Sequence, residues 1–511
     1  MVKKTSMTVV ILGLALAAGA TDYYLDSATG DDAADGRSER TAWKSIGRMS
    51  EAKLAAGDRV LFCRGGVWRG NFKLQSGAKG TPIYYGPYGE GPRPEVLGSV
   101  AKNDLADWTQ VTNGVWATAP TDGKAAYGGD VGNLVFDEGV AVGWKKWSMD
   151  DLEADYDYWY DEATGQVCLR LGCNPATVHR SIELGCRIFI INHAAKHAVI
   201  DSLALRHSGG FAIAGMGAHD VIVRNCVIEW IGGAKQGVNP TRPWPVRYGN
   251  GIEYWGTASD CMVERCYFDQ IYDAALTPQA GANDKTGFSN IVFRNNVIRR
   301  AEYSYELWHH CPEGRMDNIV FEHNTCLDAG RGFGHRERPD PNGCHMLFSD
   351  HPCASTSLII RNNVFCRAED ESIMYRRGDL AGLDLNHNLY WNDNDAKLRV
   401  FCRQRWDIFT IFWRTWTTGF GHRPLMHDSS PEGLLEYREA TGYEVGSIYA
   451  RPCFRDEASG DWRLREDSPG ANVATDGGPV GVRVLPDEPS VHGDRDKIDC
   501  CGSSSLTIKE T

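Results

Sequence analysis

Three carboxylates in the middle of the chain occupy related places in segments of similar pattern. Glu253 lies in GIEYW, Asp273 in DAALT and Glu306 in SYELW. Hydrolysis of a glycosidic bond requires two carboxyl groups, one protonated and one ionised. Crowding of like charges raises one carboxyl pKa and so provides the acid. We expect Glu306 and Asp273 to form the acid–base pair, with Glu253 as the alternative. Incidental carboxylates on a solvated face are the competing interpretation.

Basic residues follow Glu306 along the chain and form a second group. They are His309, His310, Arg331, His335, Arg336, Arg338 and Arg376. Arginine binds carboxylate or sulfate through two parallel hydrogen bonds, so this group suits an anionic sugar. We expect these residues to bind substrate, and His335 to position it or to act as an acid or base near neutral pH. Internal pairing with Glu302, Glu313, Glu337 and Asp340 is the alternative.

Two tryptophans accompany the carboxylates. Strand alternation points Ile252, Tyr254, Tyr305 and Leu307 inward, and it points Glu253, Trp255, Glu306 and Trp308 outward. Outward tryptophan rings offer flat apolar faces on which sugar rings stack. Coils that stack about 4.8 Å apart would separate Glu253 from Glu306 by roughly 9–10 Å, with Asp273 about 5–7 Å from either. These separations permit inversion slightly better than retention but do not decide between them.

A repeated strand–turn–strand pattern positions these residues. Its six segments are VIVRNCVIEW (221–230), MVERCYFDQI (262–271), IVFRNNVIRR (291–300), IVFEHNTCLD (319–328), LIIRNNVFCR (358–367) and LDLNHNLYWN (383–392). The shared turn position carries Cys226, Cys266, Asn296, Asn324, Asn363 and Asn388. Asparagine tolerates the left-handed bend that a sharp turn needs, and stacked asparagines hydrogen-bond along a stack. Roughly 25 residues per repeat predicts the coils of a parallel β-helix rather than a propeller.

Several segments resemble a known family. They are YYLDSATGDDAADGRSERTAWKSI (23–46), GDRVLFCRGGVWRG (57–70), NPATVHRSIE (174–183) and PCFRDEASGDWRLREDSPG (452–470). With the repeat, they resemble secreted bacterial members of the pectin-lyase-like superfamily. The resemblance implies an all-β, right-handed parallel β-helix and a carbohydrate-active protein, similar to β-helix glycosidases of the xylanase and α-fucosidase type and to polysaccharide lyases. One fold hosts many reactions, so the resemblance says little about reaction type.

The chain divides into five expected parts. They are a signal peptide (1–20), an N-terminal cap with the first coils (21–129), a small β insertion (130–181), the main β-helix (182–485) and a polar tail (486–511). Residues 432–442 are expected to form a short helix that Gly442 ends. Long loops at 232–249, 279–289 and 334–357 are expected to frame a cleft.

Charge and targeting signals limit the partners. The net charge of −13 excludes a general nucleic-acid binder, and removal of a signal peptide with two lysines would make it −15. We expect a secreted or periplasmic monomer with no membrane span and a polysaccharide partner. The sixteen cysteines then lie in a compartment that permits disulfides, whose pairing the sequence does not give. No cofactor is expected, although Asp31, Asp32 and Asp35 could hold a structural calcium ion.

Three functions remain open. The first is a glycoside hydrolase acting on a complex polysaccharide, for which an anionic or sulfated substrate is one option. The second is a polysaccharide lyase, in which Arg336 or Arg338 neutralises a uronate while a histidine or Tyr303 removes a proton. The third is a non-catalytic glycan-binding β-helix. Uneven loop insertions around one region favour an enzyme.

Overall fold

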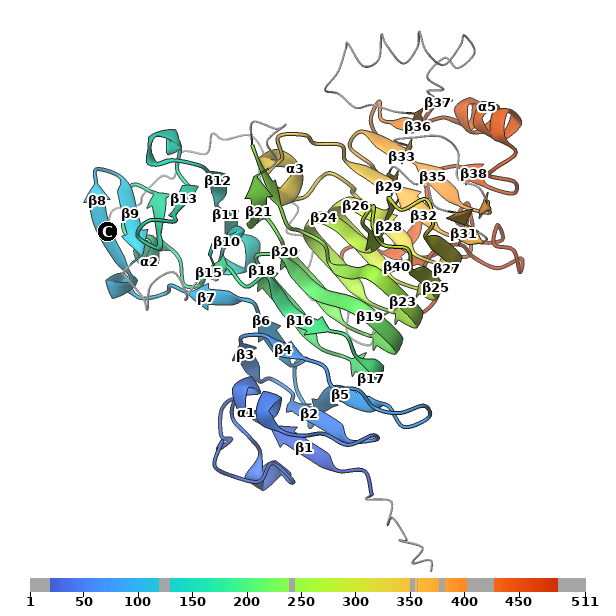
Figure 1. The fold of residues 1–511 in the computed structure, drawn as a ribbon. Helices are drawn as coiled ribbons and strands as arrows, with labels where there is room; N and C mark the ends of the chain where they lie inside the picture. The colour runs from blue at the N-terminus through green and yellow to red at the C-terminus, as the bar shows by residue number, and fades with distance from the viewer. Residues whose placement is uncertain are drawn as a thin grey trace, which may run out of the picture.

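The protein is a right-handed parallel β-helix (Figure 1). The computed structural model describes residues 19–118, 129–238, 244–349, 354–355, 357–375, 382–401 and 427–485. Nearly all of the expected signal peptide and the whole polar tail lie outside these ranges. Among the described residues, no helix is long and apolar enough to cross a bilayer.

Short parallel strands form the first coils, next to helix α1 (Ile46–Glu51). These strands are β1 (Asp22–Leu25), β2 (Arg59–Cys63), β3 (Val67–Arg69), β4 (Phe72–Lys73), β5 (Ile83–Tyr88) and β6 (Glu95–Leu97). They continue the ladder of the main solenoid, since β4 pairs with β16 (Phe189–His193), β5 with β17 (Lys196–Asp201) and β6 with β18 (Ala204–Ser208). The N-terminal cap and the main solenoid are therefore one continuous structure.

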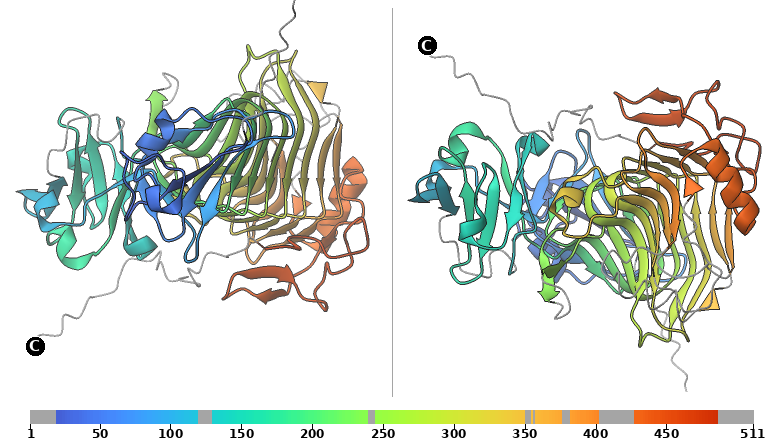
Figure 2. Two further views of the ribbon diagram at one scale, coloured as in Figure 1. Left: turned by 90° about the horizontal axis from the view of Figure 1, so that it is seen from below. Right: turned by 90° about the horizontal axis from the view of Figure 1, so that it is seen from above.

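Longer strands build the middle of the solenoid, and they bend from one face of the coil to the next. They are β19 (Phe211–Arg224), β23 (Ile252–Glu264), β24 (Tyr267–Ala280) and β26 (Val297–His309), of 13 or 14 residues each. The shorter strands among them are β20 (Val227–Ile231), β25 (Gly287–Arg294), β27 (Arg315–Glu322), β28 (Thr325–Leu327) and β29 (Cys344–Phe348). The last coils contain β30 (Ala354–Ser355), β31 (Leu358–Arg361), β32 (Val364–Cys366), β33 (Glu371–Tyr375), β34 (Leu383–Asn386), β35 (Leu389–Trp391), β36 (Lys397–Phe401), β37 (His427–Asp428) and β38 (Ile448–Tyr449). Figure 2 shows these coils stacked along one axis.

The expected alternation of side chains is confirmed. Ile252 of β23 pairs with Leu276 of β24, which pairs with Tyr305 of β26. All three side chains are buried in the main core of the solenoid. Apolar residues at every second position therefore fill the interior and leave the intervening positions for the outer face.

A ladder of asparagines runs along the turn position, as expected. Asn324 Oδ1 accepts hydrogen bonds from the backbone N–H and the amide of Asn296, both at 3.0 Å. Asn363 and Asn388 extend the same pattern. The ladder satisfies buried polar groups at each bend. Cys226 and Cys266 stack at its start as thiols, and the twelve cysteines that the structure describes form no disulfide.

The expected left-handed conformation of the ladder asparagines is wrong by one residue. The positive φ angles belong to the preceding residues, among them Asn295 at 53°, His323 at 53° and Asn362 at 60°. The preceding residue makes the bend. The ladder asparagine stays buried, where its amide can reach the next coil.

An insertion of two small sheets stands beside the solenoid (Figure 2). The first sheet contains β7 (Ser99–Ala101), β10 (Asn133–Phe136), β11 (Ala141–Val142) and β15 (Ile182–Gly185). The second contains β8 (Trp108–Thr112), β9 (Val115–Thr118), β12 (Trp144–Lys146), β13 (Asp157–Asp161) and β14 (Gln166–Arg170). Helix α2 (Pro175–Val178) precedes β15. These pairings extend the insertion from Ser99 to Gly185, a wider segment than the expected 130–181.

Helices α3 (Phe333–Glu337) and α5 (Pro431–Thr441) lie on the outside of the solenoid. Helix α5 ends at Gly442, whose φ of 76° is the left-handed cap expected from the sequence. A hairpin of β39 (Phe454–Asp456) and β40 (Asp461–Leu464) follows β38. Helix α3 lies between the insertion and the solenoid (Figure 1).

A shared apolar cluster joins the insertion to the solenoid. Val135 and Val142 from the insertion pack with Trp230 and Tyr272 from the solenoid and with Phe333 from α3. The insertion and α3 are thereby fixed against the strands that carry the candidate carboxylates.

Candidate active site

A cleft of about 290 Å³ opens on the outer face of β24 and β26. Its walls come from the hairpin of β21 (Lys235–Val238) and β22 (Pro245–Arg247) and from the segment that follows α3. The lining residues are Gln236, Trp244, Pro245, Val246, Arg247, Trp255, Tyr272, Asp273, Gln279, Tyr303, Glu306, Trp308, Arg338, Pro339 and Asp340. The expected loops 232–249 and 334–357 therefore frame it, whereas loop 279–289 contributes only Gln279.

The strand register brings the three predicted carboxylates to one face of three neighbouring strands. Glu253 of β23 lies opposite Thr277 of β24. Because Leu276 pairs with Tyr305 of β26 and Gln279 with Trp308, Thr277 also lies opposite Glu306. Glu253 and Glu306 thus occupy one row, two coils apart.

Asp273 lies earlier on the strand between these two carboxylates, at a register shift between Ile271 and Ala274. This displacement along the strand agrees with the sequence-based expectation. Asp273 and Glu306 both line the cleft.

The two predicted tryptophans also share a row, with Gln279 between them. Trp255 pairs with Gln279, which pairs with Trp308. The rings of the two tryptophans are 5.6 Å apart between centroids and are tilted by 35°. Gln279 donates a hydrogen bond from its amide to Glu306 Oε2 at 2.8 Å, which orients this carboxylate beside the rings.

Arg338 holds the carboxylate of Asp273. Its Nη1 donates to Asp273 Oδ1 at 2.8 Å and to the backbone oxygen of Tyr272 at 3.2 Å. The Nε atom lies 3.9 Å from Glu302 and 3.8 Å from Asp340. Three carboxylates therefore surround one buried guanidinium.

Glu253 lies behind the cleft rather than on its surface. Burial raises the pKa of Glu253 to about 7, against a hydrogen bond from the Asn250 amide at 2.5 Å, and the charge of Asp273 adds to the rise. Asn250 also accepts a hydrogen bond from the backbone of Ala274. Glu253, a carboxyl group with a pKa near neutrality, thus lies next to Asp273, which Arg338 binds.

His335 of α3 points toward Glu302 instead of the cleft. Its Nδ1 lies 3.1 Å from Glu302 Oε2. Burial lowers the pKa of His335, but the hydrogen bond and the negative charge of Glu302 outweigh this effect and hold the pKa above its usual value. His335 does not line the cleft. It contacts Glu302, which is also a neighbour of Arg338.

The predicted basic group divides in the structure. Arg331 is paired with Glu369 and Asp393, and Arg336 stacks 3.7 Å over the ring of Trp144. Neither lines the cleft.

The two neighbouring histidines differ as well. His309 is buried against Thr286 and Cys311, whereas His310 stacks on Trp308 with a centroid separation of 4.2 Å. Arg376 lies outside the described residues. Arg338 is the member of the predicted basic group that reaches the cleft.

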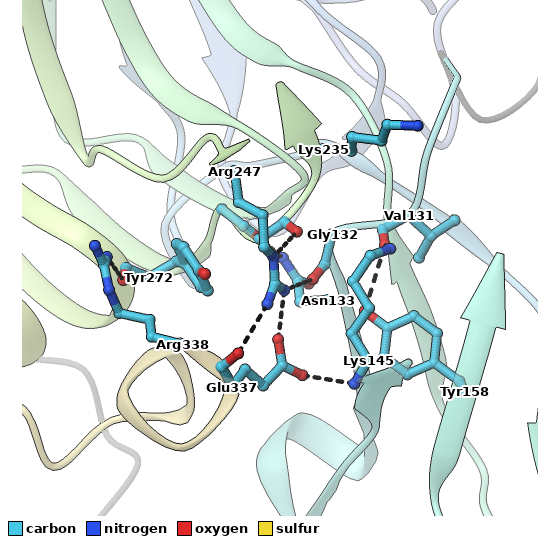
Figure 3. Close-up of polar contacts among 12 residues, drawn as sticks. Val131, Gly132, Asn133, Lys145, Tyr158, Lys235, Arg247, Tyr272, Glu337 and Arg338 are labelled. Atoms are coloured by element: carbon cyan, nitrogen blue, oxygen red, sulfur yellow. Dashed lines mark hydrogen bonds and ion pairs between the residues drawn. The ribbon is translucent and has the colours of Figure 1, made fainter. Parts of the chain in front are cut away.

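A buried charge network supports the cleft wall from the insertion side (Figure 3). Arg247 Nη2 donates to Glu337 Oε2 at 2.5 Å, and Glu337 Oε1 accepts from the backbone N–H of Lys145 at 2.9 Å. The Lys145 ammonium group bonds to Asp130 at 2.7 Å. Arg247 also lies 4.3 Å from the ring of Tyr272. The pairing of Glu337 with residues of the hairpin and the insertion fixes the chain immediately before Arg338.

Sequence reasoning did not identify several cleft residues. Gln236, Trp244, Arg247, Tyr272 and Gln279 line the cleft without having been singled out. Gln279 could have been found by counting, because it lies two residues after the position equivalent to Glu253 and Glu306. The others enter through a loop and a bulged strand, whose geometry no repeat pattern specifies.

The aspartates considered for calcium act as turn caps. Asp31 and Asp35 each accept a backbone N–H two residues on, and Asp32 accepts those of Lys44 and Ser45. Within the described ranges, no three His, Cys, Asp or Glu side chains converge as metal ligands. We therefore assign these carboxylates to the loop itself.

Comparison with solved structures found distant similarities. The chain is similar to XylC in its complex with xylose, with a TM-score of 0.45 and 11% identity over 84% of this chain and 83% of that one. It is also similar to the GH136 lacto-N-biosidase from Eubacterium ramulus (TM-score 0.40, 15% identity, 75% and 68% covered) and to pectate lyase Pel9A (0.37, 11%, 73% and 69%). No protein-family model and no curated protein matches the sequence.

The strand register and the sheet order define the class of protein. The chain is a right-handed parallel β-helix. Because this fold supports several reactions, the reaction must be argued from the cleft.

Proposed function

We propose that the protein is a secreted carbohydrate-active enzyme, a glycoside hydrolase that cleaves a polysaccharide or a fragment of one. The observation that carries this proposal is the meeting of Glu306 and Asp273 in one cleft with Trp255 and Trp308. Carboxyl groups supply the acid and the base of glycoside hydrolysis, and tryptophan faces hold sugar rings in place.

The two carboxylates have different surroundings, which suits different roles. Asp273 is bound by the Arg338 guanidinium at 2.8 Å, and we assign it the role of base or nucleophile. Glu306 is bonded to the neutral amide of Gln279, and we assign it the role of acid toward the leaving sugar. Glu253 lies beside Asp273, and its pKa is raised to about 7. In its protonated form it adds no negative charge next to Asp273, which limits like-charge repulsion.

The lyase alternative requires a cation that is available to a uronate carboxylate. Arg338 and Tyr303 both line the cleft and would be the neutralising group and the base. However, Arg338 is already bonded to Asp273 and approached by Glu302 and Asp340, so its charge is largely offset. Hydrolysis is therefore the better supported reaction.

A polysaccharide screen tests the proposal. Purified protein is incubated with plant and marine polysaccharides, and the products are followed by both reducing ends and ultraviolet absorbance. We expect reducing ends without absorbance, and we expect their loss in the Asp273→Asn variant. Unsaturated, absorbing products would indicate a lyase, and binding without cleavage would indicate a glycan-binding protein.

A further inference from the structure

Arg338 and Arg247, the two arginines that line the cleft, are already paired with carboxylates of the protein. Arg338 contacts Asp273 at 2.8 Å and lies within 4 Å of Glu302 and Asp340. The imidazole of His335, directly behind, is directed at Glu302. A carboxylate or sulfate of a ligand would therefore have to compete with acidic groups that are part of the fold.

Arg247, the second arginine of the cleft, is bound even more firmly. It pairs with Glu337, and the two side chains are only 3% and 2% exposed. Turning Arg247 toward a ligand would leave the Glu337 carboxylate buried without its main partner, which is strongly unfavourable. Arg247 therefore forms part of the wall through its contact with the ring of Tyr272. Its charge is paired with Glu337 inside the protein.

Among the described residues of the cleft, carboxylates outnumber basic groups. Asp273, Glu306 and Asp340 line it, and Glu302 and Glu337 stand directly behind its two arginines. Five carboxylates thus face two guanidinium groups and the His335 imidazole in the part of the chain that the structure describes. Like charges brought together in a cleft disfavour the wrong ligand by repulsion.

The remaining contacts suit uncharged sugars. Trp255 and Trp308 present aromatic faces, and Gln236 and Gln279 present amides that donate and accept hydrogen bonds. Hydroxyl groups of a neutral sugar match these amides, and its C–H faces match the rings. We propose that the sugar units bound in this cleft are uncharged, so that uronate and sulfated units are excluded. This inference rests on the glycan-processing function proposed above, and it replaces the anionic substrate that the basic residues in the sequence suggested.

Matched pairs of polysaccharides that differ only in charge test the inference. The Glu306→Gln variant, which holds substrate without rapid cleavage, is titrated with a uronan and its carboxyl-reduced form, and with a sulfated galactan and its desulfated form. We expect a neutral member to bind at least about tenfold more tightly than its charged partner. Added salt should reduce this difference, because it screens repulsion.

The outcomes separate the two proposals. Equal or tighter binding of the charged member, weakened by salt, would overturn the inference while leaving a carbohydrate-active function in place. Binding of no member would contradict the proposed function, and the inference with it.

Two charge variants show where discrimination arises. Asp340→Asn removes one negative charge from the cleft and should reduce the preference at least threefold. Asp467→Asn makes the same change in net charge at a side chain that is 67% exposed and pairs with Arg465 at 2.7 Å. The Asp467 variant should leave the preference unchanged; an equal effect of both variants would place the origin in the overall charge and overturn the inference.

Discussion

At the scale of single residues, the carboxylates differ more in their environments than in their positions. Asp273 faces an arginine, Glu306 an amide and Glu253 the amide of Asn250 within a buried site. Counting along the repeat predicts that these three share a face. It does not predict their partners, because Arg338 reaches Asp273 from 65 residues away through a loop.

Glu253 should make stability depend on pH. Its pKa of about 7 in the folded state exceeds the ordinary value of 4.5, so the folded protein binds the additional proton between these pH values. The free energy of unfolding therefore falls as pH rises from 4.5 to 7, by up to about 3 kcal/mol from this group. In Glu253→Gln this contribution is absent, so the variant should gain stability relative to the wild type over the same window.

Chemical denaturation at several pH values measures this difference. Glu313→Gln, at a side chain that is 66% exposed, provides the control and should follow the wild type. If the difference between Glu253→Gln and the wild type stays constant from pH 4.5 to 8, the raised pKa of Glu253 is refuted.

At the scale of elements, α3 is the part that sequence reasoning described least well. The segment around Arg331–Arg338 was expected to present its basic side chains to a ligand. The structure instead folds it into one helical turn that packs Phe333 against Trp230 and Tyr272 and places His335 and Glu337 in ion pairs. Charge alone could not distinguish these outcomes, since the partners come from distant segments, Glu302 from β26 and Arg247 from the hairpin.

Gly334 permits the close contact between α3 and β24. A Cβ atom at this position would lie 2.7 Å from the backbone of Tyr272, which cannot move without disturbing the cleft. We expect Gly334→Ala to lower the free energy of unfolding by about 1–3 kcal/mol and to weaken substrate binding, because Arg338 follows the helix.

Denaturation and substrate titration of the Gly334→Ala variant check this expectation. Gly172→Ala is the matched control, since a Cβ atom there meets nothing within 4 Å. Unchanged binding by Gly334→Ala would mean that α3 does not position the cleft.

At the scale of the whole molecule, the repeat made the fold predictable. Six segments with one turn position sufficed to predict a parallel β-helix, and the asparagine ladder confirms their register. The start of the insertion was harder to predict from the sequence. Strand β9 pairs with β8 on one side and, on the other, with β14 about fifty residues later, and antiparallel partners at such a distance leave no repeat to recognise.

The apolar cluster at α3 should make the insertion and the solenoid unfold together. Val135 and Val142 on one side and Trp230 on the other are all buried in it. We expect a single calorimetric transition, which Phe333→Ala should broaden or split as contacts across the cluster are lost. Two separate transitions in the wild-type protein would contradict a continuous core.

The most direct test of the account is the hydrolytic rate of Glu306→Gln on a glycan that the wild type cleaves. Loss of a general acid costs about 10²–10⁴-fold in rate, so the variant should fall by that factor. Glu313→Gln removes an exposed carboxylate beyond the same strand and should keep the full rate. A Glu306→Gln variant as active as the wild type would contradict the assignment of this cleft as the catalytic site.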